Sequence, residues 1–135
     1  MNAHFESHGI DPDVLLEIFD VPITFHRCLV PVAGGVTAAL MLSQAIWMTE
    51  TLAQKTEGWF MCSQEQWTQE TGLSRWEQET ARRELRMAGL MEERLQGMPA
   101  KLWFRVCPKA VHDALQMVID QRRIEDLRRS RASRA

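Results

Sequence analysis

Residues 63–89 decide the fold, and they read SQEQWTQETGLSRWEQETARRELRMAG. Ser63 and Gln66 have the spacing of a capping box, in which each side chain satisfies a free backbone N–H group at the start of a helix. A short helix is therefore expected to end at Gly72, and a second one should follow over residues 75–88. Two helices joined by a short turn that contains glycine indicate a helix-turn-helix.

The chain continues with the pattern of a β-hairpin. Residues 90–95 and 101–106 are strand candidates, and the loop between them contains Gly97 and Pro99. Apolar residues alternate strictly with charged or tryptophan side chains in the second strand. One face of this strand should therefore be buried.

The segments before the helix pair complete the fold. Apolar residues recur at helical spacing over residues 36–54, which predicts the longest and most buried helix. Glu57 and Gly58 predict a turn, and residues 59–62 a short strand. The order helix, strand, helix, turn, helix, strand, loop, strand predicts a winged helix-turn-helix, which is mainly α with a small β hairpin.

Two further regions flank the winged-helix domain, which we place at residues 33–106. Residues 1–32 should form an N-terminal extension with a short amphipathic helix after Asp11 and an extended edge segment between Pro22 and Pro31.

Residues 107–135 should form a C-terminal helix that starts at Pro108 and ends in a frayed, exposed basic tail over residues 128–135. This helix either packs on the first long helix or pairs with its counterpart in a second chain, and a homodimer suits a palindromic site. The candidate interface residues are Val111, Leu115, Val118, Ile124 and Leu127.

Charge is distributed unevenly along the chain. The 135 residues hold 16 basic and 18 acidic side chains, a formal net charge of -2, which is not the strongly basic balance typical of a DNA-binding domain. Residues 1–57 hold two basic and seven acidic side chains, residues 58–106 seven of each, and residues 107–135 seven basic and four acidic. Non-specific DNA binding is therefore expected to be weak.

The stretch from Gly58 to Val106 resembles the winged-helix domain of replication proteins carried by phages and mobile elements, including the N-terminal domains of DnaD-like replication organisers. The matching motifs are GWF at 58–60, QEQW at 64–67, TGLSR at 71–75, EQETAR at 77–82, Leu85, GL at 89–90 and MPAKLWFR at 98–105. The helix around Gln44 and Trp47 is also similar to that family's first helix. The resemblance implies binding of double-stranded DNA at an origin or operator.

In a winged helix the second helix of the pair enters the major groove, and the hairpin touches the DNA backbone or minor groove. Arg75 and Arg83 lie two turns apart on nearly the same side, so one can read a guanine edge while the other holds a phosphate. Gln78 can read adenine if it is not turned toward the core. The candidate DNA-binding residues are Ser74, Arg75, Trp76, Gln78, Glu79, Arg82, Arg83 and Arg86 on the helix and Arg94, Gln96 and Lys101 on the hairpin.

Two features favour an alternative function. The helix arginines alternate with Glu77, Glu79 and Glu84, which is typical of a solvated, salt-bridged face. Trp76 and Trp103 fall on polar faces, whereas the core needs Trp47, Trp59 and Trp67, and an exposed tryptophan indicates a protein partner. The alternative is a winged-helix adaptor or inhibitor that binds another protein instead of DNA.

Other classes of function have little support. His26, Cys28, Cys107 and His112 lack the spacing of a structural zinc site, so we expect no metal and no cofactor. The chain has no nucleophile elbow, phosphate-binding glycine loop or catalytic carboxylate pair, which argues against an enzyme.

The expected location is the cytoplasm. The most apolar stretch, residues 36–48, is far shorter than the roughly 20 apolar residues of a membrane span, and no secretion signal is evident. We therefore expect a cytoplasmic protein that binds double-stranded DNA in replication initiation or transcriptional control of a bacterial mobile element.

Overall fold

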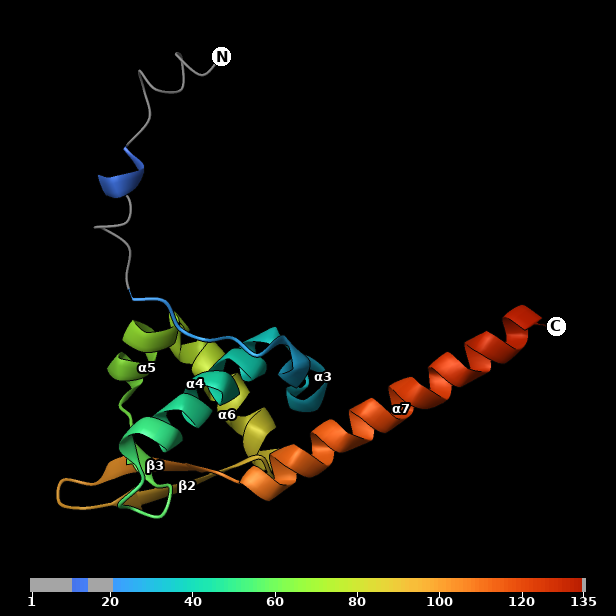
Figure 1. Cartoon of the computed structure of the whole chain (residues 1–135). Coiled ribbons are helices and arrows are strands. Elements are labelled where there is room, and N and C mark those ends of the chain that lie inside the picture. The colour runs from blue at the N-terminus through green and yellow to red at the C-terminus, as the bar shows by residue number, and fades with distance from the viewer. Residues whose placement is uncertain (1–10, 15–20, 135) are drawn as a thin grey trace.

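A computed structural model describes residues 11–14 and 21–134 (Figure 1). Its elements from residue 27 onward are a 3-10 helix (Arg27–Leu29), α3 (Val30–Ala33), α4 (Val36–Leu52), β1 (Phe60–Met61), α5 (Gln64–Thr71), α6 (Arg75–Met87), β2 (Met91–Gln96), β3 (Lys101–Val106) and α7 (Pro108–Arg134). The fold is mainly helical with a small three-stranded antiparallel sheet, which confirms the predicted fold class at this level.

Helix α4 runs through the centre of the core. Ala38, Ala39, Met41, Leu42 and Ala45 are all 0% exposed. Because alanine side chains are short, helices α3, α5 and α6 and strands β1 and β3 can all approach this helix closely. The prediction of a long, buried helix is therefore confirmed.

Two polar side chains are buried in α4, and both have hydrogen-bond partners. The Ser43 hydroxyl donates to the Ala39 carbonyl at 2.7 Å and accepts from the His26 backbone N–H at 3.0 Å. The Gln44 amide donates to Oε2 of Glu70 at 3.2 Å. The bond from the His26 N–H ties the segment before α3 to α4, and the bond between Gln44 and Glu70 ties α5 to α4. Both buried side chains therefore keep hydrogen-bond partners.

The sheet has the strand order β1-β3-β2 and covers one side of the core. Phe60 pairs with Phe104, and their rings stack with centroids 5.9 Å apart. The Trp67 ring of α5 meets Phe104 edge to face at 5.4 Å. Helices α4 and α6 pack on this inner face, and Figure 1 shows the helices on one side of the β2–β3 hairpin.

Both predicted helix starts are confirmed. The Gln66 N–H donates to the Ser63 hydroxyl at 3.1 Å, and the Ser63 N–H donates to the Gln66 side chain at 2.8 Å. Ser74 and Glu77 form a second capping box with bonds of 3.2 and 3.0 Å. Gly72 ends α5 with φ 77°, a left-handed conformation that glycine adopts without strain.

The predicted edge strand between Pro22 and Pro31 is wrong. Residues 27–33 are helical, and Pro31 lies in the first turn of α3, where its fixed φ and missing N–H group are tolerated. Gly34 ends α3 with φ 92°, and α4 begins directly afterwards. The two prolines, which suggested an edge strand, instead bracket a helix start.

The predicted N-terminal helix is confirmed only in part. Residues 12–14 are helical, and Asp11 Oδ1 accepts from the Asp13 backbone N–H at 3.0 Å, as an N-cap does. The remaining apolar residues of that prediction, Leu15, Ile18 and Phe19, lie outside the described residues.

Helix α7 continues to Arg134, so the prediction of a frayed tail is wrong, although the tail is exposed as predicted. Residues 109–134 contain neither glycine nor proline and are rich in arginine, which is a good helix former. Figure 1 shows that α7 leaves the other helices after its first turns and extends away from them.

Within the described residues, no single helix is long and apolar enough to cross a membrane. Arg27–Ala33 and Val36–Leu52 reach the required length and apolar composition only when they are taken together, and they are bent by 114° relative to each other.

Candidate nucleic-acid interface

Helix α6 buries one side and leaves the other to solvent. Gln78 and Leu85 point into the molecule. On the opposite side the side chain of Arg75 is 77% exposed and Trp76 is 74% exposed, and Arg83 is also exposed. The exposed face of α6 therefore combines cations with a tryptophan, and the predicted exposure of Trp76 is confirmed.

Gln78 is not available to read a base, so that part of the prediction is wrong. Its Nε2 donates to the Gln64 carbonyl at 3.1 Å, to Thr68 Oγ1 at 2.9 Å and to the Leu73 carbonyl at 3.0 Å. The residue is 2% exposed. Gln78 instead fixes the angle between α5 and α6, since it holds both the start of α5 and the turn.

Arg82 and Arg86 are engaged by a carboxylate that the sequence analysis missed. Arg82 Nε donates to Oε1 of Glu93, and Arg86 Nη1 donates to Oε2 of the same residue at 2.6 Å. Glu93 lies in β2 opposite Phe104, on the inner face, and its side chain is 10% exposed. A carboxylate in such a position needs cationic partners, which α6 supplies. The alternation of side chains along β2 places Glu93 on the same face as the buried Met91, and this pattern could have predicted that Glu93 points inward.

The other two arginines of α6, Arg75 and Arg83, are less engaged in ion pairs. Arg75 Nε contacts Glu79 Oε1 at 3.4 Å, an exposed i,i+4 pair that contributes little to stability. Arg83 has no ion pair with any residue that the structure describes. Arg75 and Arg83 are therefore the predicted contacts on α6 that are most available to a ligand.

The hairpin candidates Arg94, Gln96 and Lys101 lie on the other face of the sheet from α6. In the register Arg94 pairs with Trp103 and Gln96 pairs with Lys101. Paired residues share a face, and the alternating residue Phe104 is buried under the helices. The predicted DNA-binding residues therefore form two separate surfaces and not one.

We call the second surface the outer sheet face. Its members are Met61 in β1, Glu92, Arg94 and Gln96 in β2, and Lys101, Trp103 and Arg105 in β3. Helices α4 and α6 contact the strands from the inner side, and the residue before β1, Trp59, lies against part of the outer sheet face.

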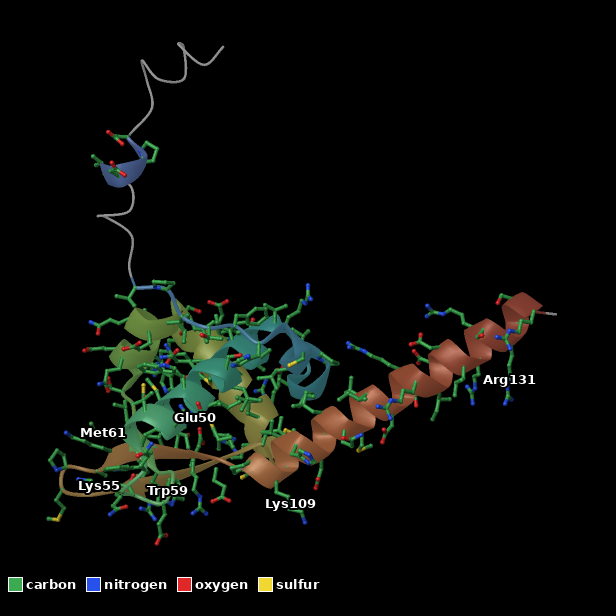
Figure 2. All side chains as sticks on the ribbon, viewed as in Figure 1. Glu50, Lys55, Trp59, Met61, Lys109 and Arg131 are labelled. Atoms are coloured by element: carbon green, nitrogen blue, oxygen red, sulfur yellow. The ribbon has the colours of Figure 1, made fainter. Side chains whose placement is uncertain are left out.

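Trp59, which precedes β1, is stacked under two arginines of the outer sheet face. The guanidinium carbons of Arg94 and Arg105 lie 4.2 and 4.7 Å from its ring centroid. Arg105 also donates to Glu92 Oε2 at 2.9 Å, and this bond lowers the pKa of the Glu92 carboxyl from its ordinary value. Trp59 is 9% exposed, and Figure 2 shows it below the sheet, on the side away from α4.

The other tryptophans divide between core and surface. Trp67 is 1% exposed, as predicted for the core, and its Nε1 has no hydrogen-bond partner among the described residues. Trp47 is 47% exposed, so its prediction as a core residue is wrong. Alanine and methionine already fill the inner side of α4, which leaves Trp47 at the surface. Trp103 is half-buried.

Two hollows border α6. A cavity of about 520 Å³ lies between the start of α5, α6 and the hairpin. Trp67 and Arg82 line it, and so do Met61 and Lys101 at the edge of the outer sheet face. A shallower groove of about 200 Å³ lies between the start of α4 and the far side of α6, where Glu77 and Glu84 line it together with Trp76. The flank of α6 that faces α4 is therefore acidic, whereas on the flank that faces the sheet Arg82 and Arg86 share the carboxylate of Glu93.

The five apolar residues predicted as an interface on α7 are split by the structure. Val111 is 7% exposed in the core, and Leu115 packs against the same core. Val118 is half-buried, while Ile124 and Leu127 are 44% and 63% exposed. The first turns of α7 thus belong to the domain, and only its later residues offer free apolar surface.

No family model, no curated protein and no solved structure matches this chain significantly. Its function must therefore be inferred from its own residues.

Proposed function

We propose that the chain is a winged-helix protein that binds double-stranded DNA, with α6 as the recognition helix and the β2–β3 hairpin as the wing. The proposal rests on one observation, the exposed cationic face of a rigidly held helix. Arg75 and Arg83 are separated by eight residues, which is about 12 Å along the axis. That distance allows one guanidinium to contact a base edge in the major groove while the other contacts a phosphate.

The support for α6 as a recognition helix comes from its anchoring. The Ser74 capping box fixes its first turn, and Gln78 ties it to α5 through three hydrogen bonds. The base-reading half of such a helix is its N-terminal half. The residues there that remain exposed are Ser74, Arg75, Trp76 and Glu79. Glu79 can accept a hydrogen bond from a cytosine amine.

Binding of this kind involves no chemistry, and we infer a role in replication initiation or transcriptional control of a bacterial mobile element. The cytoplasm suits the three cysteines, which are all free thiols. Because Arg82 and Arg86 are held by Glu93, the number of phosphates contacted is small, and affinity for random DNA should be low.

The test is a salt titration of duplex DNA binding with variants of the full chain. Arg83→Ala and Arg75→Ala should weaken binding, and loss of one phosphate contact should reduce the slope of log affinity against log salt by about 0.9. Arg86→Ala is the matched control, because this arginine is already engaged and should change the slope little. Failure to bind any duplex at low salt would overturn the proposal.

The second candidate function, an adaptor or inhibitor that binds another protein, is favoured by the exposed apolar residues of α6. Trp76 is 74% and Met87 is 80% exposed, and Trp76 borders the groove that Glu77 and Glu84 line. Large exposed apolar side chains beside a groove are typical of protein interfaces. If Trp76→Ala abolishes the effect of the protein in cells while its affinity for duplex DNA is unchanged, the adaptor function replaces the DNA-binding function.

A homodimer through α7 is part of the proposal. Val118, Ile124 and Leu127 are the residues left for such an interface, since Val111 and Leu115 are used within the chain. Sedimentation of the full chain and of the double variant Ile124→Lys, Leu127→Lys tests it. An unchanged mass would remove α7 from the interface.

A further inference from the structure

We propose that the outer sheet face binds single-stranded nucleic acid, independently of the duplex site proposed on α6. Bases would stack on Trp103 and on the guanidinium planes beside it, and Arg94 and Lys101 would hold the phosphates. This function goes beyond duplex recognition, because the outer sheet face lies on the opposite side of the sheet from α6. Arg94 and Lys101 also belong to the proposed wing, so Trp103 and Arg83 are the residues that distinguish the two sites.

Aromatic and cationic side chains lie next to each other on the outer sheet face. Cross-strand pairing places Met61 and Arg94 on either side of Trp103. Met61 is 37% exposed, and Trp103 is half-buried. Tryptophan side by side with a cation on a sheet face that no described helix covers is the combination that single strands require, because their unstacked bases offer flat faces and their backbone is anionic. Bases in a duplex are already stacked on one another and offer no such faces.

Two of the cations are held in place before any ligand binds. Arg94 and Arg105 both stack on the ring of Trp59, at 4.2 and 4.7 Å from its centroid. A planar guanidinium is itself a surface on which a base can stack. Because their side chains are ordered by Trp59, these arginines lose less conformational entropy when they bind than free arginines would.

The outer sheet face carries more positive than negative charge. Among the strand residues, Arg94, Lys101 and Arg105 oppose one carboxylate, Glu92, which is already paired with Arg105. Beside the strands, Glu57 and Lys109 line a hollow together with Glu92 and Arg105, and their charges offset each other. A net positive face repels a second copy of itself, so it is poorly suited to a symmetric dimer interface. The same charge attracts a polyanion. The six-residue strands of the hairpin are about 20 Å long, which gives room for several nucleotides.

The experiment measures fluorescence anisotropy of a labelled oligothymidylate of about 16 nucleotides, which has little structure of its own, with the intact chain. We expect binding that weakens steeply with salt. Trp103→Ala should reduce affinity for the oligonucleotide by about fivefold or more, the effect of losing one stacked base. Trp103→Phe should retain most of the affinity, and Arg94→Ala should reduce the salt slope.

Matched variants separate this proposal from the duplex proposal. Trp76→Ala replaces a tryptophan that is more exposed, but on α6, and should leave the affinity for the single strand unchanged. Arg83→Ala should weaken only the duplex. Circular dichroism and thermal unfolding establish that Trp103→Ala is folded, and Lys101→Ala, at an exposed position, tests the face without touching the core.

Three results would overturn the proposal. The first is no binding of the oligonucleotide at low salt. The second is equal loss with Trp76→Ala and Trp103→Ala. The third is binding that Arg83→Ala abolishes, since the single strand would then occupy α6. Retention of an acidic protein by the outer sheet face without any oligonucleotide binding would likewise assign this face to a different partner.

Discussion

Arg82 in α6 and Glu93 in β2 are joined by a hydrogen bond that connects the exposed helix to the inner face of the sheet. The second oxygen of Glu93 accepts from Arg86, one turn further along α6. One carboxylate therefore orients the helix and at the same time pairs with two of its positive charges. The same contact that stabilises the fold reduces the affinity that the helix can have for an anion.

Replacing this carboxylate should change stability and binding in opposite directions. Glu93→Gln keeps the shape of the side chain but removes its charge, so we expect a loss of about 1–3 kcal/mol in the free energy of unfolding. The two released arginines should increase the magnitude of the salt slope for duplex binding by up to about 1.8. Urea denaturation and a salt titration measure the two effects.

The control for this variant is Glu92→Gln, one residue away but on the outer sheet face. Its pair with Arg105 is partly exposed, so the stability loss should stay below about 1 kcal/mol, and duplex binding through α6 should not change. If both variants alter duplex binding equally, the two faces of the sheet are not separate binding surfaces.

Gln78→Ala should destabilise the protein by about 1–3 kcal/mol, because it leaves buried acceptors in α5 and in the turn without their donor. Duplex affinity should fall as well, since the angle between α5 and α6 is no longer fixed. Gln69→Ala, at an exposed position in α5, is the control and should change neither quantity. A stable Gln78→Ala variant with wild-type affinity would contradict the role given to Gln78.

The capping box of α6 predicts a pH dependence of stability. The backbone N–H and hydroxyl of Ser74 lower the pKa of Glu77 from its ordinary value. A carboxyl whose folded pKa is lowered stabilises the folded state above its unfolded pKa of about 4.3, and this contribution is lost as the pH falls through the folded value. Wild type should therefore be more stable than Glu77→Gln at pH 7, and the gap should close below about pH 4.

The measurement for this prediction is the urea midpoint of both proteins from neutral to acid pH. Ser74→Gly is a useful comparison, because it retains the carboxylate but removes the hydroxyl of the cap. A gap between wild type and Glu77→Gln that is constant across the range would show that the ionised carboxylate contributes nothing.

The three thiols should react in a fixed order with a disulfide reagent at pH 8. Cys28 is exposed and should react first. Burial, reinforced by the hydrogen bond to Glu92, raises the pKa of Cys107, so it should react more slowly. Cys62 is 2% exposed and burial raises its pKa to about 12, so it should react only on unfolding. Cys28→Ser should remove the fast phase, and a fast phase that persists would contradict this assignment.

The local elements could be predicted from the sequence because their causes are local. Ser63 with Gln66 marks a helix start within four residues, and Gly72 and Gly89 mark helix ends. The alternation around Phe104 likewise identified the buried face of β3. In each case the residues that determine the conformation are neighbours in the chain.

The parts that could not be predicted depend on distant residues. Gln78 turns inward because Leu73 and Gln64 offer it acceptors across the turn, and periodicity alone leaves it at the edge of the buried arc. Trp47 lies at the surface because smaller residues fill the centre of α4. Strand register places α6 and the outer sheet face on separate surfaces. The positions of the basic residues in the sequence do not reveal that register.

The length of α7 determines which charges a polyanion meets near the C-terminal end of this helix. Residues 119–134 of this helix span about 24 Å, and Figure 2 shows Arg131 at the end far from the other helices. Electrostatic potentials decay over about 8 Å at physiological salt. The arginines near the tip are therefore screened from the acidic side chains of α4 and α6. The net charge of -2 is an average over regions that do not sense one another.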